Sequence, residues 1–258
     1  MVSGKWALVT GASGGMGAEF ASLLAERGFN LVLAARSFGR LETIATNLRR
    51  FGVRIHVEQS DLTQDGSAAS LVEAIRIRDI KLDVLINNAG QGLHGAFIDQ
   101  SGDSIDRMLH LNIASLTTLT HTIASDMADR RCGHILLVAS LTAFMPCPTY
   151  AAYAATKAYV RNFGEALHAE MAPRNVVVTV LSPGLMDTGF LSASGQAPSK
   201  SMKRAMTSPR EAAETGLKAL FAGRQTVVAG SMNKVAAVAS RLLPRGMQTR
   251  IAAAALKG

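Results

Sequence analysis

The first 27 residues place a short apolar segment, a glycine-rich turn and an amphipathic segment in that order, and this arrangement restricts the fold. Residues 5–10 form an apolar run typical of a buried strand. The turn Gly11-Ala-Ser-Gly-Gly-Met-Gly17 has the spacing G-x-x-x-G-x-G, and residues 18–27 repeat apolar positions at helical spacing. Glycines let such a turn adopt positive φ and let a pyrophosphate approach the backbone. The start of the chain is therefore typical of an α/β nucleotide-binding domain.

Strands and helices are predicted to alternate along the rest of the chain. The expected strands are 6–10, 30–35, 53–58, 83–87, 134–140, 175–181 and 225–229, and the expected helices are 16–27, 39–51, 66–78, 103–130, 152–172 and 209–222. Alternation of this kind predicts a parallel sheet covered on both faces. The fold class expected is α/β, with one doubly wound Rossmann-type domain over residues 1–258 and a seven-stranded parallel sheet flanked by helices.

Composition excludes several other classes of protein. The chain is 48% hydrophobic and 18% charged, which excludes disorder, and no apolar run is long enough to span a membrane. The first strand begins at once, so no signal peptide is expected. Cys132, Cys147 and the six histidines show no metal-ligand spacing. We expect a cytoplasmic protein without a metal.

The net charge of +8 lies in two segments. Residues 36–54 carry +4, residues 231–258 carry +5, and the remainder sums to −1. No nucleic-acid motif accompanies the charge, so no nucleic-acid partner is expected. The basic tail at 231–258 also has apolar residues and could contact an anionic membrane. Packing of the tail on the domain or on a neighbouring subunit is the favoured interpretation.

Tyr153 and Lys157 have the spacing Y-x-x-x-K, which places both side chains on one face of a helix, one turn apart. A nearby cation stabilises a phenolate, so we expect Lys157 to lower the pKa of Tyr153. Such a tyrosine can give a proton to a carbonyl oxygen or take one from an alcohol. Tyr150 and Tyr159 are alternatives, but neither precedes a lysine by one turn.

The ordered set of motifs resembles the classical short-chain dehydrogenases/reductases over nearly the whole chain, in their bacterial-type, NADP-preferring form. The motifs are Thr10-Gly-Ala-Ser-Gly-Gly-Met-Gly17, Ser60-Asp-Leu62, Asn87-Asn-Ala-Gly90, Asn112, Ser140, Tyr153 with Lys157, and Pro183-Gly184 with Thr188. The resemblance implies hydride transfer between a nicotinamide cofactor and a carbonyl or alcohol.

The resemblance also implies residue roles. Tyr153 would be the acid or base, Lys157 would support it and bind the nicotinamide ribose, Ser140 would orient the substrate, and Asn112 would hold a water of the proton relay. The cofactor-binding residues implied are Gly11, Ser13, Gly15, Met16, Gly17, Arg36, Asp61, Leu62, Asn88, Ala89, Gly90, Lys157, Pro183, Gly184 and Thr188.

The end of the second strand indicates the cofactor. An acid that would accept from the ribose 2′-hydroxyl of NAD(H) is expected at this position, but the residue is Ala35, and Arg36 follows it. A guanidinium binds a 2′-phosphate well. We therefore expect NADP(H) in preference to NAD(H), although Arg36 could be a solvated arginine. The chain also has Gly14 where some NADP-binding members of the family carry a basic residue.

The substrate is predicted only as a class. Leu141, Phe144, Leu185 and Met186 are expected to line an apolar crevice, and the segment 185–208 is expected to be an irregular lid beside it. His94 could orient the substrate. These residues favour a small-molecule ketone, aldehyde or secondary alcohol with hydrophobic bulk.

Two other functions remain open, and an oligomeric assembly is expected. A non-catalytic cofactor-sensing regulator would be expected to lack Tyr153 or Lys157, and an epimerase or dehydratase would need a longer C-terminal domain. The resemblance implies a homodimer or homotetramer built partly on the helices at 103–130 and 152–172, which carry alanine-rich, weakly charged stretches.

Overall fold

The computed structural model describes residues 4–186, 188–197, 199, 202–203 and 206–256. Seven parallel strands form one sheet in the order β3-β2-β1-β4-β5-β6-β7, which confirms the predicted fold class. The strands are β1 (Trp6–Thr10), β2 (Asn30–Ala35), β3 (Ile55–Gln59), β4 (Leu82–Asn87), β5 (Gly133–Val138), β6 (Val176–Ser182) and β7 (Thr226–Val228). From β1 the chain adds β2 and β3 on one side, and it then crosses over to add β4 to β7 on the other side of β1. The connections that follow β1 and β4 therefore run to opposite sides, which leaves a crevice at the carboxyl ends of these central strands.

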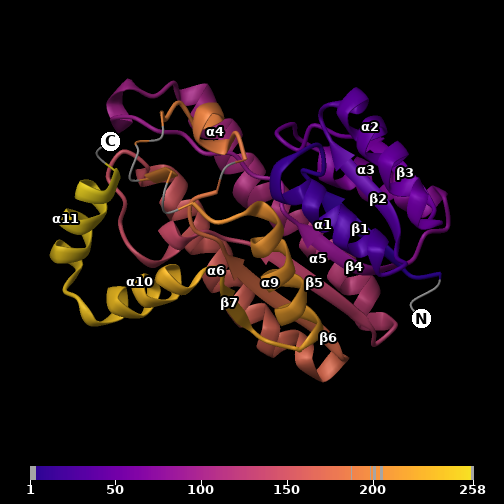
Figure 1. Cartoon of the computed structure of the whole chain (residues 1–258). Coiled ribbons are helices and arrows are strands. Elements are labelled where there is room, and N and C mark those ends of the chain that lie inside the picture. The colour runs from indigo at the N-terminus through magenta and orange to yellow at the C-terminus, as the bar shows by residue number, and fades with distance from the viewer. Residues whose placement is uncertain (1–3, 187, 198, 200–201, 204–205, 257–258) are drawn as a thin grey trace.

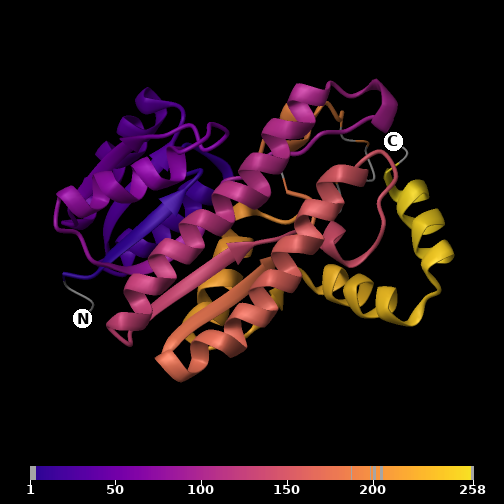
Figure 2. The ribbon, with the colours of Figure 1, turned by 180° about the vertical axis from the view of Figure 1, so that it is seen from behind.

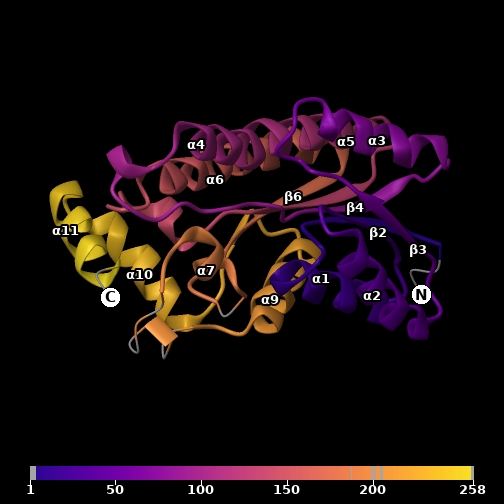
Figure 3. The same cartoon turned by 90° about the horizontal axis from the view of Figure 1, so that it is seen from above.

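Helices cover both faces of the sheet (Figures 1 and 3). The longer helices are α1 (Gly15–Glu26), α2 (Phe38–Leu48), α3 (Ser67–Ile77), α4 (Gly102–Leu109), α5 (Leu116–Asp129), α6 (Ala151–Met171), α9 (Pro209–Phe221), α10 (Ser231–Leu242) and α11 (Arg245–Leu256). The shorter ones are η1 (Arg49–Phe51), η2 (Phe97–Asp99), η3 (His110–Ser115), η4 (Leu141–Phe144), η5 (Ala172–Arg174) and α7 (Phe190–Ser194). α1, α2 and α9 lie on one face, and α3, α5 and α6 on the other.

The core consists of two apolar layers because successive residues of a strand point to opposite faces. In β1, Ala7 and Val9 pack with the α1, α2 and α9 layer, whereas Trp6 and Leu8 pack with the α3, α5 and α6 layer. Both layers are buried, so the central strands β1, β2, β4, β5 and β6 are largely apolar on both faces, whereas the edge strands β3 and β7 are partly exposed.

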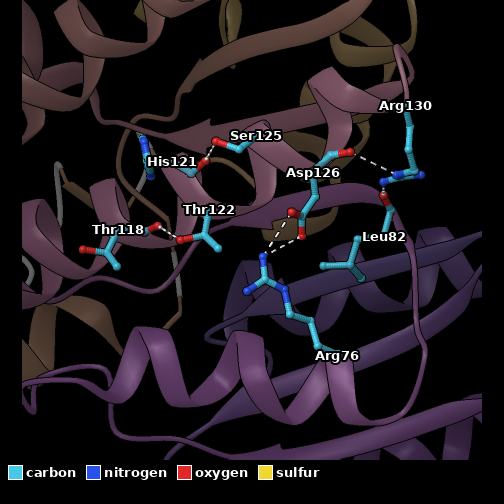
Figure 4. Close-up of polar contacts among 8 residues, drawn as sticks. All are labelled: Arg76, Leu82, Thr118, His121, Thr122, Ser125, Asp126 and Arg130. Atoms are coloured by element: carbon cyan, nitrogen blue, oxygen red, sulfur yellow. Dashed lines mark hydrogen bonds and ion pairs between the residues drawn. The ribbon is translucent and has the colours of Figure 1, made fainter.

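Polar contacts hold α5 against the rest of the domain (Figure 4). Arg76 of α3 makes two hydrogen bonds of 3.1 Å to the carboxylate of Asp126, and Arg130 donates to the Leu82 carbonyl at the start of β4. On the same helix, Thr122 and Ser125 donate to carbonyls one turn earlier. The carboxyl-terminal end of α5 is thus tied to α3 and β4, while Asn87 of β4 donates to the Leu116 carbonyl and the Thr120 hydroxyl at its amino-terminal end.

The helix expected over 103–130 has an unexpected geometry. α4 and α5 are joined by η3, a π-helical turn that contains Asn112. A π turn inserts one residue into the helix and redirects the side chains within it. Here it points Asn112 into the protein, where that residue is fully buried.

Three other segments differ from expectation. The helix predicted over 39–51 ends at Leu48 and continues as η1. The segment 185–208 is not wholly irregular, because it contains α7; residues 187, 198, 200–201 and 204–205 of this predicted lid lie outside the described residues. The tail forms α10 and α11, separated at Leu243 and Pro244, and extends from one end of the domain (Figure 2).

Candidate active site

A cavity of about 890 Å³ lies at the carboxyl ends of the central strands. Its walls contain every predicted site residue except Asn112: Gly11, Ser13, Gly15, Met16, Gly17, Arg36, Asp61, Leu62, Asn88, Ala89, Gly90, Ser140, Tyr153, Lys157, Pro183, Gly184 and Thr188. These residues come from the ends of six of the seven strands and from the helices that follow. The topology thus gathers motifs that are up to 177 residues apart, Gly11 and Thr188, into one crevice.

The glycine-rich turn forms one end of the cavity. Gly11 and Gly15 have φ of +66° and +53°, which favour glycine. A Cβ on Gly17 would lie 2.2 Å from the Gly11 carbonyl oxygen, so no larger residue fits there without moving the backbone. No side chain caps the start of the 12-residue helix α1. Its first N–H groups and the positive end of its dipole face the cavity, as a bound phosphate requires.

Thr10 ties this turn to the next one. Its hydroxyl accepts hydrogen bonds from the backbone N–H of Asn88 and of Ala89, at 3.0 and 2.9 Å. The Asn88 amide donates to the Thr10 carbonyl at 2.9 Å. Two turns that are distant in sequence are therefore held as one rigid surface. Thr10 was not among the predicted site residues, although it begins the first motif.

Arg36 lies just beyond β2, exposed and on the cavity wall, next to the nearly buried Ala35. Arg40, one turn into α2, lines the same wall and was predicted only as part of the basic segment. Among the described residues, neither guanidinium has a hydrogen-bond or ion-pair partner. The Arg36 and Arg40 guanidinium groups at this corner of the cavity are therefore free to bind an anion, and Ala35 at the end of β2 provides no carboxylate.

Asp61 and Leu62 lie on the adjacent wall. The Asp61 carboxylate accepts from the backbone N–H and the hydroxyl of Thr63, at 3.1 and 2.8 Å, and so closes a local turn. The Leu62 carbonyl accepts from the buried Ser115 hydroxyl at 2.7 Å. One carboxylate oxygen of Asp61 is used within the turn, and the other has no partner among the described residues.

At the opposite end of the cavity lie Ser140, Tyr153 and Lys157. Ser140 lies two residues beyond β5 and caps the start of η4, where its hydroxyl accepts from the Thr142 backbone N–H at 3.2 Å. Tyr153 is nearly fully buried in the first turn of α6. Burial raises the pKa of Tyr153 above its usual value, and a hydrogen bond to Ser140 acts in the opposite direction. The Ser140 hydroxyl therefore lies close to the phenol.

Lys157 is buried beneath Tyr153. Its ammonium donates to the Val138 carbonyl at 2.9 Å and lies 5.9 Å from the centre of the Tyr153 ring. Burial lowers the pKa of Lys157 to about 8. Burial outweighs the other influences on the phenol of Tyr153, so the expected lowering of its pKa by Lys157 stays a prediction.

Asn112 lies behind the cavity. Its side chain bonds both backbone groups of Gln91, accepting from the N–H at 3.0 Å and donating to the carbonyl at 2.9 Å. It also donates to the Thr156 hydroxyl at 3.0 Å. A Cβ on Gly90 would lie 3.3 Å from both the Asn112 oxygen and the Lys157 nitrogen. Asn112 thus fixes the backbone that follows Gly90, close to Lys157.

The end of the cavity around Tyr153 includes residues that were not predicted as site residues; one of them, Tyr150, was considered only as an alternative acid. The Tyr150 hydroxyl bonds Ser194 at 2.8 Å and Gln196 at 2.9 Å, which links the start of α6 to the segment around α7. Cys147 lines the wall, and burial raises the pKa of its thiol to about 11. Ala252 of α11 also lines it. No local motif signals these residues, because only the folded chain brings them together.

The predicted apolar lining is correct for Leu141, Leu185 and Met186 and wrong for Phe144. Phe144 points away from the cavity, packs against the α3, α5 and α6 layer, and lies under the Arg161 guanidinium at 4.2 Å.

The other predicted candidates lie at or away from this end. The His94 ring lies 5.0 Å from the Tyr150 ring, while the cavity wall includes neither His94 nor Tyr159. The Tyr159 hydroxyl is instead bonded to Thr117 on the exposed side of α6.

Within the described ranges, no three His, Cys, Asp or Glu side chains are placed to hold a metal ion. None of the helices in that part of the chain combines the length and apolar character needed to cross a bilayer.

Comparisons with known proteins place the fold and site in a family. The model of the short chain dehydrogenase family matches residues 5–199. The human 17-beta-hydroxysteroid dehydrogenase type 3 is 35% identical over 190 residues, which cover 72% of this chain and 61% of that enzyme. The chain therefore spans about three fifths of the length of that relative.

Two solved structures are similar over most of both chains. A short-chain dehydrogenase from Sphingobium yanoikuyae in complex with NADPH is 29% identical, with a TM-score of 0.82 over 92% of this chain and 94% of that one. A bulky-bulky ketone specific alcohol dehydrogenase from Comamonas testosteroni is 31% identical, with a TM-score of 0.78 over 92% of each chain. The chain belongs to the short chain dehydrogenase family of oxidoreductases.

Proposed function

We propose that this protein transfers a hydride between NADP(H) and a ketone, an aldehyde or a secondary alcohol with hydrophobic bulk. The observation that carries the proposal is the continuity of one cavity. At one end it has the glycine turn and two unpaired arginines, and at the other it has Ser140, Tyr153 and Lys157. A cofactor extended along this cavity would present its reactive ring to the substrate end.

The residues present fit an NADP(H) molecule. The cradle at Gly11, Gly15 and Gly17 leaves room for a pyrophosphate, and the uncapped start of α1 offers it backbone N–H donors. Arg36, with Arg40 one turn away, would hold a 2′-phosphate, because Ala35 leaves no carboxylate there to repel it. The Sphingobium yanoikuyae structure in complex with NADPH supports this choice. Related structures in complex with NAD or NADH make it a choice that must be tested.

A bound nicotinamide supplies or accepts the hydride; the remaining work is done by side chains. Ser140 would hold the substrate oxygen beside the Tyr153 hydroxyl, which lies close to it. Tyr153 would give a proton to that oxygen in reduction and take one in oxidation. Lys157 would place its charge below the phenol, and Asn112 would keep the backbone at Gly90 and Gln91 in position.

The substrate class rests on the walls of the cavity. Leu141, Leu185, Met186 and Phe190 line its substrate end, together with Ala252. An apolar wall with a few convergent polar groups suits a lipophilic ketone. The human and Comamonas testosteroni relatives are a hydroxysteroid dehydrogenase and an enzyme for bulky-bulky ketones, and both names agree with this class.

The test is an assay of purified protein with NADPH against a panel of aryl, steroid and long-chain ketones. Oxidation of NADPH with at least one bulky ketone is expected, together with much weaker activity with NADH. A protein that binds NADPH but reduces no member of the panel would favour the alternative, a cofactor-sensing regulator.

We also infer a homodimer or homotetramer in the cytoplasm. The exposed sides of α5 and α6 carry few charges, which suits contact between copies through these helices. The two cysteines, Cys132 and Cys147, are free thiols, as expected in a reducing compartment.

A further inference from the structure

The C-terminal arm, defined as α10 and α11, exposes an apolar face. On α10, Met232, Val235, Val238 and Leu242 are 78%, 64%, 61% and 82% exposed. Their spacing of three, three and four residues places them on one side of the helix. The packing expected between the tail and the domain is limited to other positions, such as Ala237 and Ala252. A contiguous exposed apolar face usually marks a contact surface.

The arm is also uniformly basic. Lys234, Arg245 and Arg250 are exposed, and no acidic residue occurs between 231 and 258. None of these three cations has an ion-pair partner among the described residues. The surface that covers the arm should therefore be apolar and bordered by negative charge.

A surface of that kind exists on the same molecule. In η2, Phe97 and Ile98 are 59% and 89% exposed. Asp99 follows them in η2, and Asp103 and Asp106 lie one turn apart on α4; all three are exposed and have no ion-pair partner within the described part of the chain. We call these five residues the acidic patch. The segment leading into α4 and the helix α11 lie at the same end of the molecule in all three ribbon views (Figures 1, 2 and 3).

We propose that the C-terminal arm of one subunit covers the acidic patch of a second copy of this chain, and that the second copy does the same in return. A two-fold axis through this end of the molecule makes the two contacts equivalent. Each contact has apolar side chains bordered by opposite charges, as protein interfaces do. An anionic membrane would attract the arm, but the three carboxylates at the same end would repel it, so a second copy suits the surface better.

This contact lies beside the substrate end of the cavity. Ala252 of α11 lines the cavity, and the segment that leads to η2 begins at Gln91, Gly92 and Leu93 on its wall. The interface is distinct from the one expected on α5 and α6. It does not depend on which substrate or cofactor the enzyme uses.

The first test measures mass in solution by sedimentation velocity. The variant Val235→Glu with Leu242→Glu buries carboxylates in the proposed contact, so the assembly should dissociate to half its mass, with affinity at least about tenfold weaker. Ile77→Glu is the matched control, because Ile77 is 76% exposed on α3, outside both surfaces. An unchanged mass for the double variant would overturn the proposal.

The second test exchanges the charges. Lys234→Glu, Arg245→Glu and Arg250→Glu together form the arm reversal; Asp99→Lys, Asp103→Lys and Asp106→Lys together form the patch reversal. Each reversal alone should halve the mass. A 1:1 mixture of the two, or one chain that carries both, should restore it. Failure of both restorations in folded protein, judged by thermal unfolding, contradicts the pairing.

Sedimentation with vesicles of phosphatidylserine and phosphatidylcholine tests whether an anionic membrane, and not a second copy of the chain, covers the arm. Wild type should stay in the supernatant at physiological salt. If it sediments with these vesicles, and the arm reversal abolishes that binding without changing the mass, the arm is a membrane surface and the proposal is wrong.

Discussion

The two ends of the cavity are built in different ways. The cofactor end consists of backbone groups and glycines in short contiguous motifs, such as residues 11–17 and 88–90, with exposed arginines at its edge. The substrate end consists of side chains from η4, α6, α7 and α11, and its titratable groups are buried. The first end is defined by local sequence, and the second by how distant segments pack.

This difference has a consequence for function. Changes at the cofactor end should alter affinity for the dinucleotide, because its groups are accessible and are proposed to contact the cofactor. Changes at the substrate end should alter the rate and the pH dependence, because its groups hold protons in a buried setting. The predictions below test this separation, beginning with the largest effect.

Tyr153→Phe should lower kcat by about 10²–10⁴-fold, because it removes the proton donor. Affinity for NADPH should remain nearly unchanged. Tyr159→Phe is the control, because the Tyr159 hydroxyl bonds Thr117 on the exposed side of α6. A Tyr153 variant that keeps a third or more of the wild-type kcat in steady-state assays would refute the assignment.

Lys157→Met should remove a pH dependence of stability in the protein without cofactor. The pKa of Lys157 is lowered from 10.5 to about 8 in the folded state, so the unfolded chain binds more protons between these values. Stability should therefore rise with pH through this window, and the cost of burying the charge, about 3 kcal/mol, should be fully present below pH 8. The raised pKa of Tyr153 acts in the opposite direction above pH 10, so the useful range is pH 7.5 to 9.5.

Urea unfolding at several pH values measures this effect. Wild type should gain stability over that range relative to Lys157→Met. Lys81→Met, at an exposed position, should behave as wild type. Equal pH dependence in wild type and Lys157→Met would show that Lys157 is not a source of it.

Arg36→Ala should raise the KM for NADPH by about 10- to 150-fold, since a charged hydrogen bond contributes about 1.5–3 kcal/mol. The KM for NADH and the kcat should change little. Arg49→Ala serves as the control, because Arg49 belongs to the same basic segment but pairs with Glu42 outside the cavity. Equal weakening of both cofactors would contradict the proposed phosphate contact.

Gly17→Ala should destabilise the protein by about 1–3 kcal/mol, because a Cβ would lie 2.2 Å from the Gly11 carbonyl oxygen and 2.7 Å from the Asn88 amide nitrogen. It should also weaken NADPH binding without changing the pH profile of kcat. Gly39→Ala has nothing within 4 Å of the new Cβ and should leave stability close to wild type. Urea unfolding and a fluorescence titration with NADPH measure both effects.

Sequence alone predicts the fold, and it also predicts which residues gather at the glycine-turn end of the cavity, for physical reasons. Strands buried on both faces appear as continuous apolar runs, and the glycine turn has steric requirements that only its own residues meet. Arg36 and Asp61 come just after β2 and β3, and the carboxyl ends of parallel strands lie at the same edge of the sheet. These features depend on neighbours in the chain.

The rest depends on tertiary structure. The lowered pKa of Lys157 comes from its depth under the sheet edge, and the raised pKa of Tyr153 comes from burial beside Tyr150 and Cys147. The position of Ala252 on the cavity wall requires the turn between α10 and α11. Phe144 was predicted to line the cavity because it is close to Ser140 in the sequence, but η4 turns its side chain toward the core. Such outcomes are decided by contacts between distant segments.

Transfer of deuterium from NADPH tests the central claim most directly. Purified protein is incubated with NADPH that carries deuterium at both C4 positions and with the bulky ketone that is reduced fastest, and the alcohol is examined by mass spectrometry and NMR. We predict one deuterium on the carbinol carbon of the product. Tight binding of the labelled cofactor without deuterium transfer to any ketone of the panel would contradict the account.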